Sequence, residues 1–197
     1  MTKKQLAALQ RIIDREASRI AWGKERLKET DQDAMREAGL HPSRDRFVVT
    51  DGNVAVIFRD KPEDVHEAER MDGLYDIMRT EIEFNDQFYD HLLALTVTAE
   101  HISEWKKQSK PWKAGKTNKT GAVPVKLTAQ RENGGTLEGF YDPRYVLDAA
   151  EAIGPGAMLY IGRYSKNSPF CSLLVFPRDW MEDKDHVTGY VLPLRMM

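Results

Sequence analysis

The sequence has one cysteine, no long apolar run and almost no net charge, and each of these shortages excludes a class of protein. With Cys171 alone, neither an internal disulfide framework nor a multi-cysteine metal site can form. Nowhere do about 18 apolar residues follow one another, as a membrane-spanning helix requires, and the first residues lack the apolar core of a signal peptide. We therefore expect a cytoplasmic protein without a membrane partner.

Charge is distributed unevenly along the chain. The formal net charge of −2 gives no general attraction to polyanions, so nucleic-acid binding would depend on local clusters. Residues 60–90 are strongly acidic, and we expect them to form a solvated, partly helical surface. Between Glu104 and Glu132 there is no acid, while lysines accumulate. This basic stretch is either a surface that contacts phosphates or a solvated loop.

The composition is sufficient for a folded core. Of the 197 residues, 41% are hydrophobic and 30% are charged, which fits one domain or two small ones, divided here as 1–90 and 91–197. A capping box of Thr2 and Gln5 predicts a helix from about residue 3 to the high twenties, with its apolar residues on one face. Its basic residues Arg11, Arg15 and Arg19 alternate with acids, so we expect them on a solvated face.

Strands and two further helices follow. Two β-branched runs within residues 46–58 flank Asp51-Gly52, which predicts a tight hairpin. The stretch from residue 92 predicts a strand that leads into a helix, and residues 123–129 and 136–142 predict two more strands. Asp142-Pro143 and Gly154 mark the ends of another helix, and three closing strands come after it. The fold class is therefore α+β.

Four segments resemble the bacterial DNA polymerase sliding clamp, the β subunit. Residues 139–149 (GFYDPRYVLDA) are similar to the segment that enters the last helix of that family. Ser168-Pro169 with the apolar strand after it, and the chain end 190–196 (YVLPLRM), match two further segments in order and spacing. Residues 49–55 (VTDGNVA) resemble the family's threonine-aspartate-glycine hairpin, although Asn53 and Val54 stand where histidine and arginine are usual.

The resemblance implies a fold, two binding surfaces and a set of partners. The fold would consist of β-α-β-β-β half-domains with the sheets outside and the helices on one face. In the family, the hairpin and the chain end border a hydrophobic pocket that takes a linear peptide from a DNA polymerase or another replication or repair protein. Basic helix faces would meet duplex DNA without sequence preference, and a ring would require a homo-oligomer. The implied pocket residues are Thr50, Gly52, Asn53, Val54, Ala55, Val191, Leu192, Pro193 and Leu194, and the implied DNA-binding residues are Lys106, Lys107, Lys110 and Arg144.

Other functions remain as alternatives. A clamp-derived module could bind the peptides as a monomer without encircling DNA. The acids Glu81, Glu83, Asp86 and Asp90 could hold Mg²⁺ in a nuclease, but runs of acids are usually surface, so we expect no enzyme, no metal and no cofactor. Cys171 lies in an apolar strand and is expected to be an inert core residue. Trp105 and Trp112 flank lysines and could stack on bases, although core packing explains Trp105 better.

Overall fold

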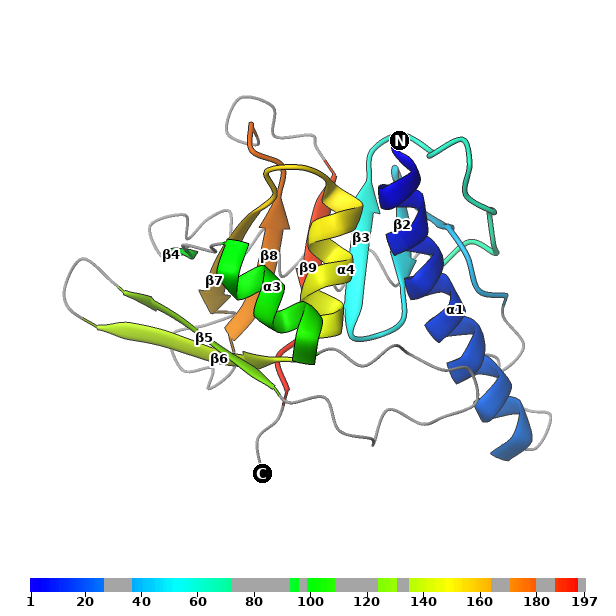
Figure 1. Ribbon diagram of the computed structural model, residues 1–197. Helices are drawn as coiled ribbons and strands as arrows, with labels where there is room; N and C mark the ends of the chain where they lie inside the picture. Colours follow the sequence, from blue (N-terminus) through cyan, green and yellow to red (C-terminus); the bar gives the residue numbers. More distant parts are fainter. Residues whose placement is uncertain are drawn as a thin grey trace.

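The computed structural model is a mixed α+β fold, which confirms the predicted class (Figure 1). It describes residues 1–26, 37–71, 93–95, 99–108, 124–130, 135–163, 171–179 and 187–194. The helices in this part of the chain are α1 (Lys3–Arg26), α3 (Ala99–Gln108) and α4 (Pro143–Ile153). The strands are β1 (His41–Ser43), β2 (Arg46–Thr50), β3 (Val54–Phe58), β4 (Leu93–Leu95), β5 (Val125–Gln130), β6 (Thr136–Tyr141), β7 (Met158–Arg163), β8 (Cys171–Phe176) and β9 (Thr188–Val191).

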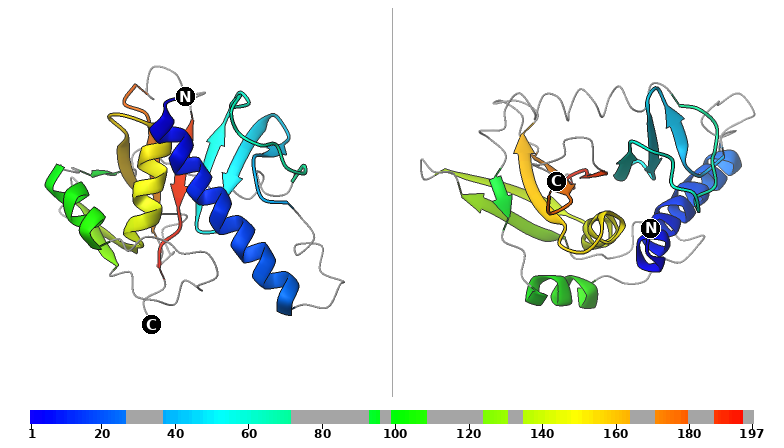
Figure 2. Two further views of the ribbon diagram at one scale, coloured as in Figure 1. Left: turned by 45° about the vertical axis from the view of Figure 1, so that its right-hand side comes forward. Right: turned by 90° about the horizontal axis from the view of Figure 1, so that it is seen from above.

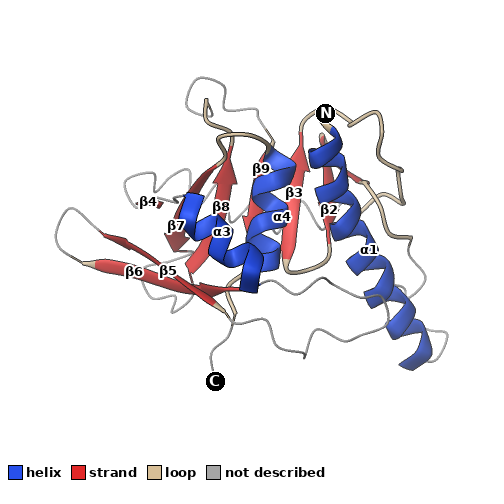
Figure 3. Cartoon of the chain, in the orientation of Figure 1, coloured by secondary structure: helices blue, strands red, loops and turns tan. Residues whose placement is uncertain are grey.

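A seven-stranded antiparallel sheet organises the molecule (Figure 3). Its strand order is β1-β2-β3-β9-β8-β7-β4, so strands from both ends of the chain lie next to each other at its centre. Val54 of β3 faces Val191 of β9, and Leu173 of β8 faces Val191 from the other side. A separate two-stranded sheet contains β5 and β6. The boundary at residue 90 lies outside the described residues, and strands from both sides of it share the large sheet.

The helices lie on one face of the large sheet (Figure 2). In α1 the side chains of Leu9 and Ile12 are fully buried against a core that also contains Val146 of α4, Val56 of β3 and Leu173 of β8. Burial of one such side chain contributes about 1.5–3 kcal/mol to folding. A second cluster of buried residues is formed by the side chains that alternate to the other face: Val48, Ala55, Ile57, Tyr160, Leu174, Phe176 and Tyr190.

The predicted helix ends are confirmed. The Gln5 amide donates to Thr2 Oγ1 at 3.3 Å, and the Thr2 amide donates to Gln5 Oε1 at 2.8 Å, as a capping box requires. Asp142 caps α4 by accepting from the Arg144 amide at 2.9 Å, and Gly154, with φ of 122°, ends the helix.

The predicted hairpin is present, but its turn is centred one residue later than expected. Thr50 pairs with Ala55, and the Asp51 amide donates to the Val54 carbonyl, so Gly52 and Asn53 are the two central residues. Gly52 has φ of 87°, which suits glycine at the first central position of a type II′ turn. Asp51 thus comes directly before the two central residues of the turn. Its carboxylate accepts hydrogen bonds from the amides of Asn53 and Val54 within the turn.

Several expectations fall on other parts of the chain. The acidic segment beyond residue 71 lies outside the described residues, and so do Lys110 and Trp112. Residues 60–71 are described and contain no helix. In the described part of the chain, no helix combines the length and the apolarity that crossing a bilayer needs.

Candidate functional site

Four segments that are distant in sequence meet at one edge of the molecule, near the lower ends of β2, β3 and β9 in Figure 1. They are the β2–β3 turn, the chain end after β9, the junction of β6 with α4, and the middle of α1. The Leu192 amide donates to the Asn53 carbonyl at 2.8 Å, and the Leu194 amide donates to the Phe140 carbonyl at 2.7 Å. The chain end therefore connects the turn to the two-stranded sheet. We call this region the hairpin edge and take it as the candidate site.

The turn at the hairpin edge is held rigidly by its own side chains. Asp51 Oδ1 accepts from the amides of Asn53 at 2.8 Å and Val54 at 3.1 Å. Thr50 Oγ1 donates to the Val54 carbonyl at 2.8 Å and accepts from the Gly52 amide at 3.1 Å. Because the backbone donors and acceptors of the turn are satisfied internally, the turn can present a fixed surface to a ligand.

A buried arginine connects this turn to both long helices. Arg15 of α1 is only 6% exposed; its Nε donates to Asp51 Oδ2 at 2.5 Å and its Nη1 to Asp148 Oδ2 of α4 at 2.5 Å. Its guanidinium also lies 5.0 Å from the ring centre of Tyr145, within the range of a cation–π contact. The remaining nitrogen, Nη2, is buried and has no hydrogen-bond partner among the described residues. Arg15 is therefore a structural node, contrary to the expectation that it lies on a solvated face.

Burial and the two carboxylates act on the Arg15 and Tyr145 pKa values. Desolvation lowers the pKa of the Arg15 guanidinium, but Asp51 and Asp148 outweigh it, so the pKa is raised above its ordinary value. Desolvation raises the pKa of the Tyr145 phenol to about 12, with a further contribution from Asp51 and Asp142. Arg15 is therefore charged and Tyr145 neutral at physiological pH.

The network continues along the helix layer and pairs several of its cations. Arg11 binds Asp148 and Glu151, each at 2.7 Å. Glu151 Oε1 also lies 3.4 Å from the Lys4 ammonium and 3.7 Å from the Lys106 ammonium. Much of the positive charge on this face is thus balanced by Asp148 and Glu151.

The structure divides the expected pocket residues into two groups. Thr50, Val54, Ala55 and Val191 are buried in the sheet and form its framework. The other group is accessible at the hairpin edge. Leu192 is 40% exposed, Gly52 is exposed, and Asn53, Pro193 and Leu194 are half-buried. Any ligand here would meet the second group.

Of the expected DNA-binding residues, the structure describes Lys106, Lys107 and Arg144. Lys106 and Lys107 are exposed in the last turn of α3, and Lys106 is close to Glu151. The Arg144 side chain is only 14% exposed and is bound to the Asp142 carboxylate at the start of α4. The Arg144 guanidinium is therefore engaged at the start of α4. Of the expected DNA-binding residues that the structure describes, Lys106 and Lys107 are the two with exposed side chains.

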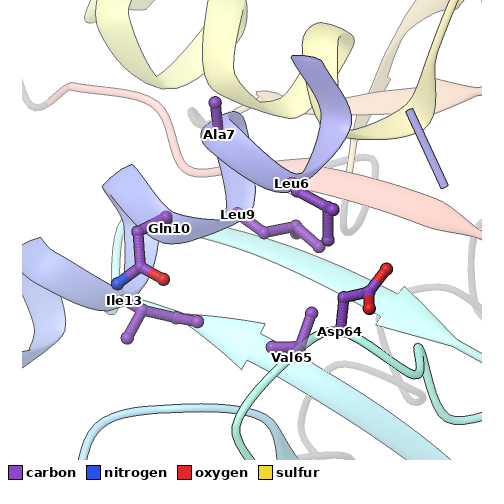
Figure 4. Close-up of a pocket in the computed structure, with 7 residues that line it drawn as sticks. All are labelled: Leu6, Ala7, Leu9, Gln10, Ile13, Asp64 and Val65. Atoms are coloured by element: carbon purple, nitrogen blue, oxygen red, sulfur yellow. The ribbon is translucent and has the colours of Figure 1, made fainter. Parts of the chain in front are cut away.

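A cavity of about 230 Å³ lies elsewhere, between α1 and the loop that follows β3 (Figure 4). Its lining is mostly apolar and comes from Leu6, Ala7, Leu9, Gln10, Ile13, Asp64 and Val65. The expected pocket residues belong to the hairpin edge and do not line this cavity.

Two buried ionic residues of α1 were missed by sequence reasoning, although the periodicity contains a signal. Arg15 follows Ala8 and Ile12 at helical spacing, and Glu16 follows Leu9 in the same way, so both extend the buried face. Glu16 is fully buried, with Oε1 3.0 Å from Nε2 of His41, which is also fully buried. Trp105, in contrast, is buried in the core as expected.

The described residues contain no group of three or more His, Cys, Asp or Glu side chains placed to hold a metal ion. Comparisons with protein-family models, with curated proteins and with solved structures found no match to the chain.

Proposed function

We propose that this protein is a sliding-clamp-like accessory protein that captures a linear peptide of a DNA polymerase or another replication or repair protein at the hairpin edge. The observation that carries the proposal is the pairing of β3 with β9, in which Val54 faces Val191 and the Asn53 carbonyl accepts from the Leu192 amide. The resemblance assigns these two segments to the walls of one peptide pocket. They are far apart in the sequence, so nothing in their local sequence requires them to meet.

The physical properties of the hairpin edge support peptide capture. Leu192 is one of only a few large apolar side chains among the described residues that are exposed. It is attached to a backbone that is fixed by hydrogen bonds on both sides, at Asn53 and at Phe140. A rigid apolar surface loses little conformational entropy when a ligand binds, which favours binding of a short segment. No reactive group is needed for this role.

The test is a selection from a display library of random eight-residue peptides on the immobilised full-length chain. Selected peptides are then titrated against the wild type and against Leu192→Glu. We expect Leu192→Glu to weaken binding at least tenfold, because it places a charge on the apolar surface that the peptide covers. Because Leu192 is exposed, the substitution should leave the fold intact, which circular dichroism checks.

Ile102→Glu is the matched control. Ile102 is 36% exposed and lies on α3, so the same change of chemistry is made on another exposed apolar side chain. This control should bind like the wild type. If both variants bind like the wild type, or if both lose binding equally, the peptide site is not at the hairpin edge.

Binding of duplex DNA is a second proposed activity, supported by the exposed Lys106 and Lys107 in the last turn of α3. Two arrangements are possible for the protein: a homo-oligomer that encircles DNA, or a monomeric module that only captures peptides and does not encircle DNA. The pairing of Arg11 and Lys4 with Glu151 on the helix layer reduces the positive charge that a DNA channel would need, which favours the second. Absolute mass by light scattering over a concentration series distinguishes them, since a closed oligomer supports encirclement and a strict monomer supports the module.

A further inference from the structure

One cation at the hairpin edge lies directly on the turn. A Cβ atom added to Gly52 would be 2.9 Å from Nη1 of Arg19 and 3.4 Å from its Cζ. The Arg19 guanidinium therefore occupies the space that a side chain at residue 52 would fill. Arg19 as a whole is an exposed residue.

The neighbouring acid does not neutralise Arg19. Asp51 is the carboxylate of the same turn, but its Oδ1 accepts from the amides of Asn53 and Val54, and its Oδ2 accepts from Arg15. Glu16, three residues before Arg19 on α1, is fully buried beside His41. Among the residues that the structure describes, no hydrogen bond or ion pair to Arg19 is present. Within the described part of the chain, the N–H donors of Arg19 are therefore not engaged by a carboxylate.

The turn against which this cation lies is hydrogen-bonded to the backbone that carries the accessible apolar side chains. Gly52 precedes Asn53, whose carbonyl accepts from the Leu192 amide, and Pro193 and Leu194 follow at once. The backbone of Gly52 is thus separated from that of Leu192 by about one or two residue lengths of 3.8 Å each. An extended peptide advances about 3.3 Å per residue, so a single short segment could contact both.

We propose that Arg19 selects peptides that carry a carboxylate, about two to four positions from the apolar side chains that cover Leu192 and Leu194. The inference rests on the proposed function, because it names the class of peptide that the hairpin edge binds. A carboxylate suits the site since a guanidinium offers two parallel N–H donors to its two oxygens. Asn53 and Val54 bring no charge to the turn, so Arg19, from a different element, supplies the polar wall of the site.

The experiment compares two libraries of eight-residue peptides on the full-length chain. Both contain Leu, Ile or Phe at two neighbouring positions, and at one other position the first has Glu and the second Gln. We expect the wild type to bind the Glu library about three- to tenfold more tightly. Arg19→Gln should abolish this preference, and Arg19→Glu should reverse it toward a third library with Lys at that position. Lys3→Gln, at another exposed cation of α1, should keep the wild-type preference.

The outcomes separate the inference from the proposed function. If Leu192→Glu loses binding but Arg19→Gln keeps the preference for Glu peptides, the role of Arg19 is wrong and the peptide site stands. If the wild type binds the Glu and Gln libraries equally, Arg19 does not select a carboxylate. If no library binds at all, both the inference and the proposed function are wrong.

Discussion

Replacement of Arg15 by methionine is the most informative perturbation of this fold. Arg15 connects α1 to the β2–β3 turn through Asp51 and to α4 through Asp148, and its side chain is almost entirely buried. Methionine has a similar length and no charge, so Arg15→Met removes the cation and leaves the packing of the stem nearly intact. The variant leaves two buried carboxylates without their shared partner.

The expected cost follows from this geometry. Removal of one partner of a buried ion pair costs about 3–5 kcal/mol, because the other charge stays buried. The loss is smaller than this because both carboxylates keep other partners. Asp51 still accepts from two backbone amides, and Asp148 still binds Arg11. The variant also removes the unpartnered Nη2, whose burial costs about 1–3 kcal/mol. Together these effects leave an expected net loss of about 2 kcal/mol, against the 5–15 kcal/mol typical of a domain.

Urea unfolding followed by tryptophan fluorescence measures this loss. Arg11→Met is the control, because Arg11 binds Asp148 as well but its side chain is 42% exposed. Exposed ion pairs contribute about 0–1 kcal/mol, so the control should lose no more than that. If Arg15→Met loses less than 1 kcal/mol, or no more than Arg11→Met, the buried node does not stabilise the fold. Addition of Asp148→Asn to Arg15→Met should recover part of the loss by removing one of the stranded charges.

Two other predictions concern the same network and the lysines. Burial raises the pKa of Tyr145 from 10.0 to about 12, so the folded state keeps a proton that the unfolded state releases. The contribution of Tyr145 to stability is complete below pH 10 and is lost as the pH rises to 12, with a slope of up to about 1.4 kcal/mol per pH unit. Tyr145→Phe should flatten this part of the stability curve, and an unchanged slope would show that the phenol titrates normally. For DNA, we expect the triple variant with Lys106, Lys107 and Lys110 changed to Glu to bind duplex more weakly, with a smaller salt dependence. If its salt dependence in a fluorescence anisotropy titration equals that of the wild type, these lysines do not contact phosphates.

Local structure was largely predictable from the sequence because its signals are local. The capping box at Thr2, the Asp142-Pro143 start of α4 and the Gly154 end each depend on residues within one helical turn. The turn after Thr50 was found but placed one residue early, since an aspartate before a glycine suits two arrangements. The bonds from Asp51 Oδ1 to the next two amides select the arrangement centred on Gly52 and Asn53.

The site was predictable only in part because its contacts are distant in sequence. The adjacency of the hairpin and the chain end was expected from a family resemblance, since periodicity alone does not decide which strands pair across the chain. Arg15 was misplaced for a similar reason: a charged residue is normally exposed unless it is paired, and its partners Asp51 and Asp148 lie far along the chain. Arg19 could not be placed on the turn at all without the packing of α1 against β2 and β3.

Chemical-shift mapping by NMR tests the central claim, peptide binding at the hairpin edge, most directly. A peptide from the display selection is titrated into the labelled full-length chain, and the backbone amides are followed. We expect the largest changes to cluster at residues 50–55 and 190–194, with Arg19 beside them. Changes concentrated around Leu6, Leu9, Ile13 and Val65 would instead place the peptide in the cavity beside α1, and peptide binding at the hairpin edge would be wrong.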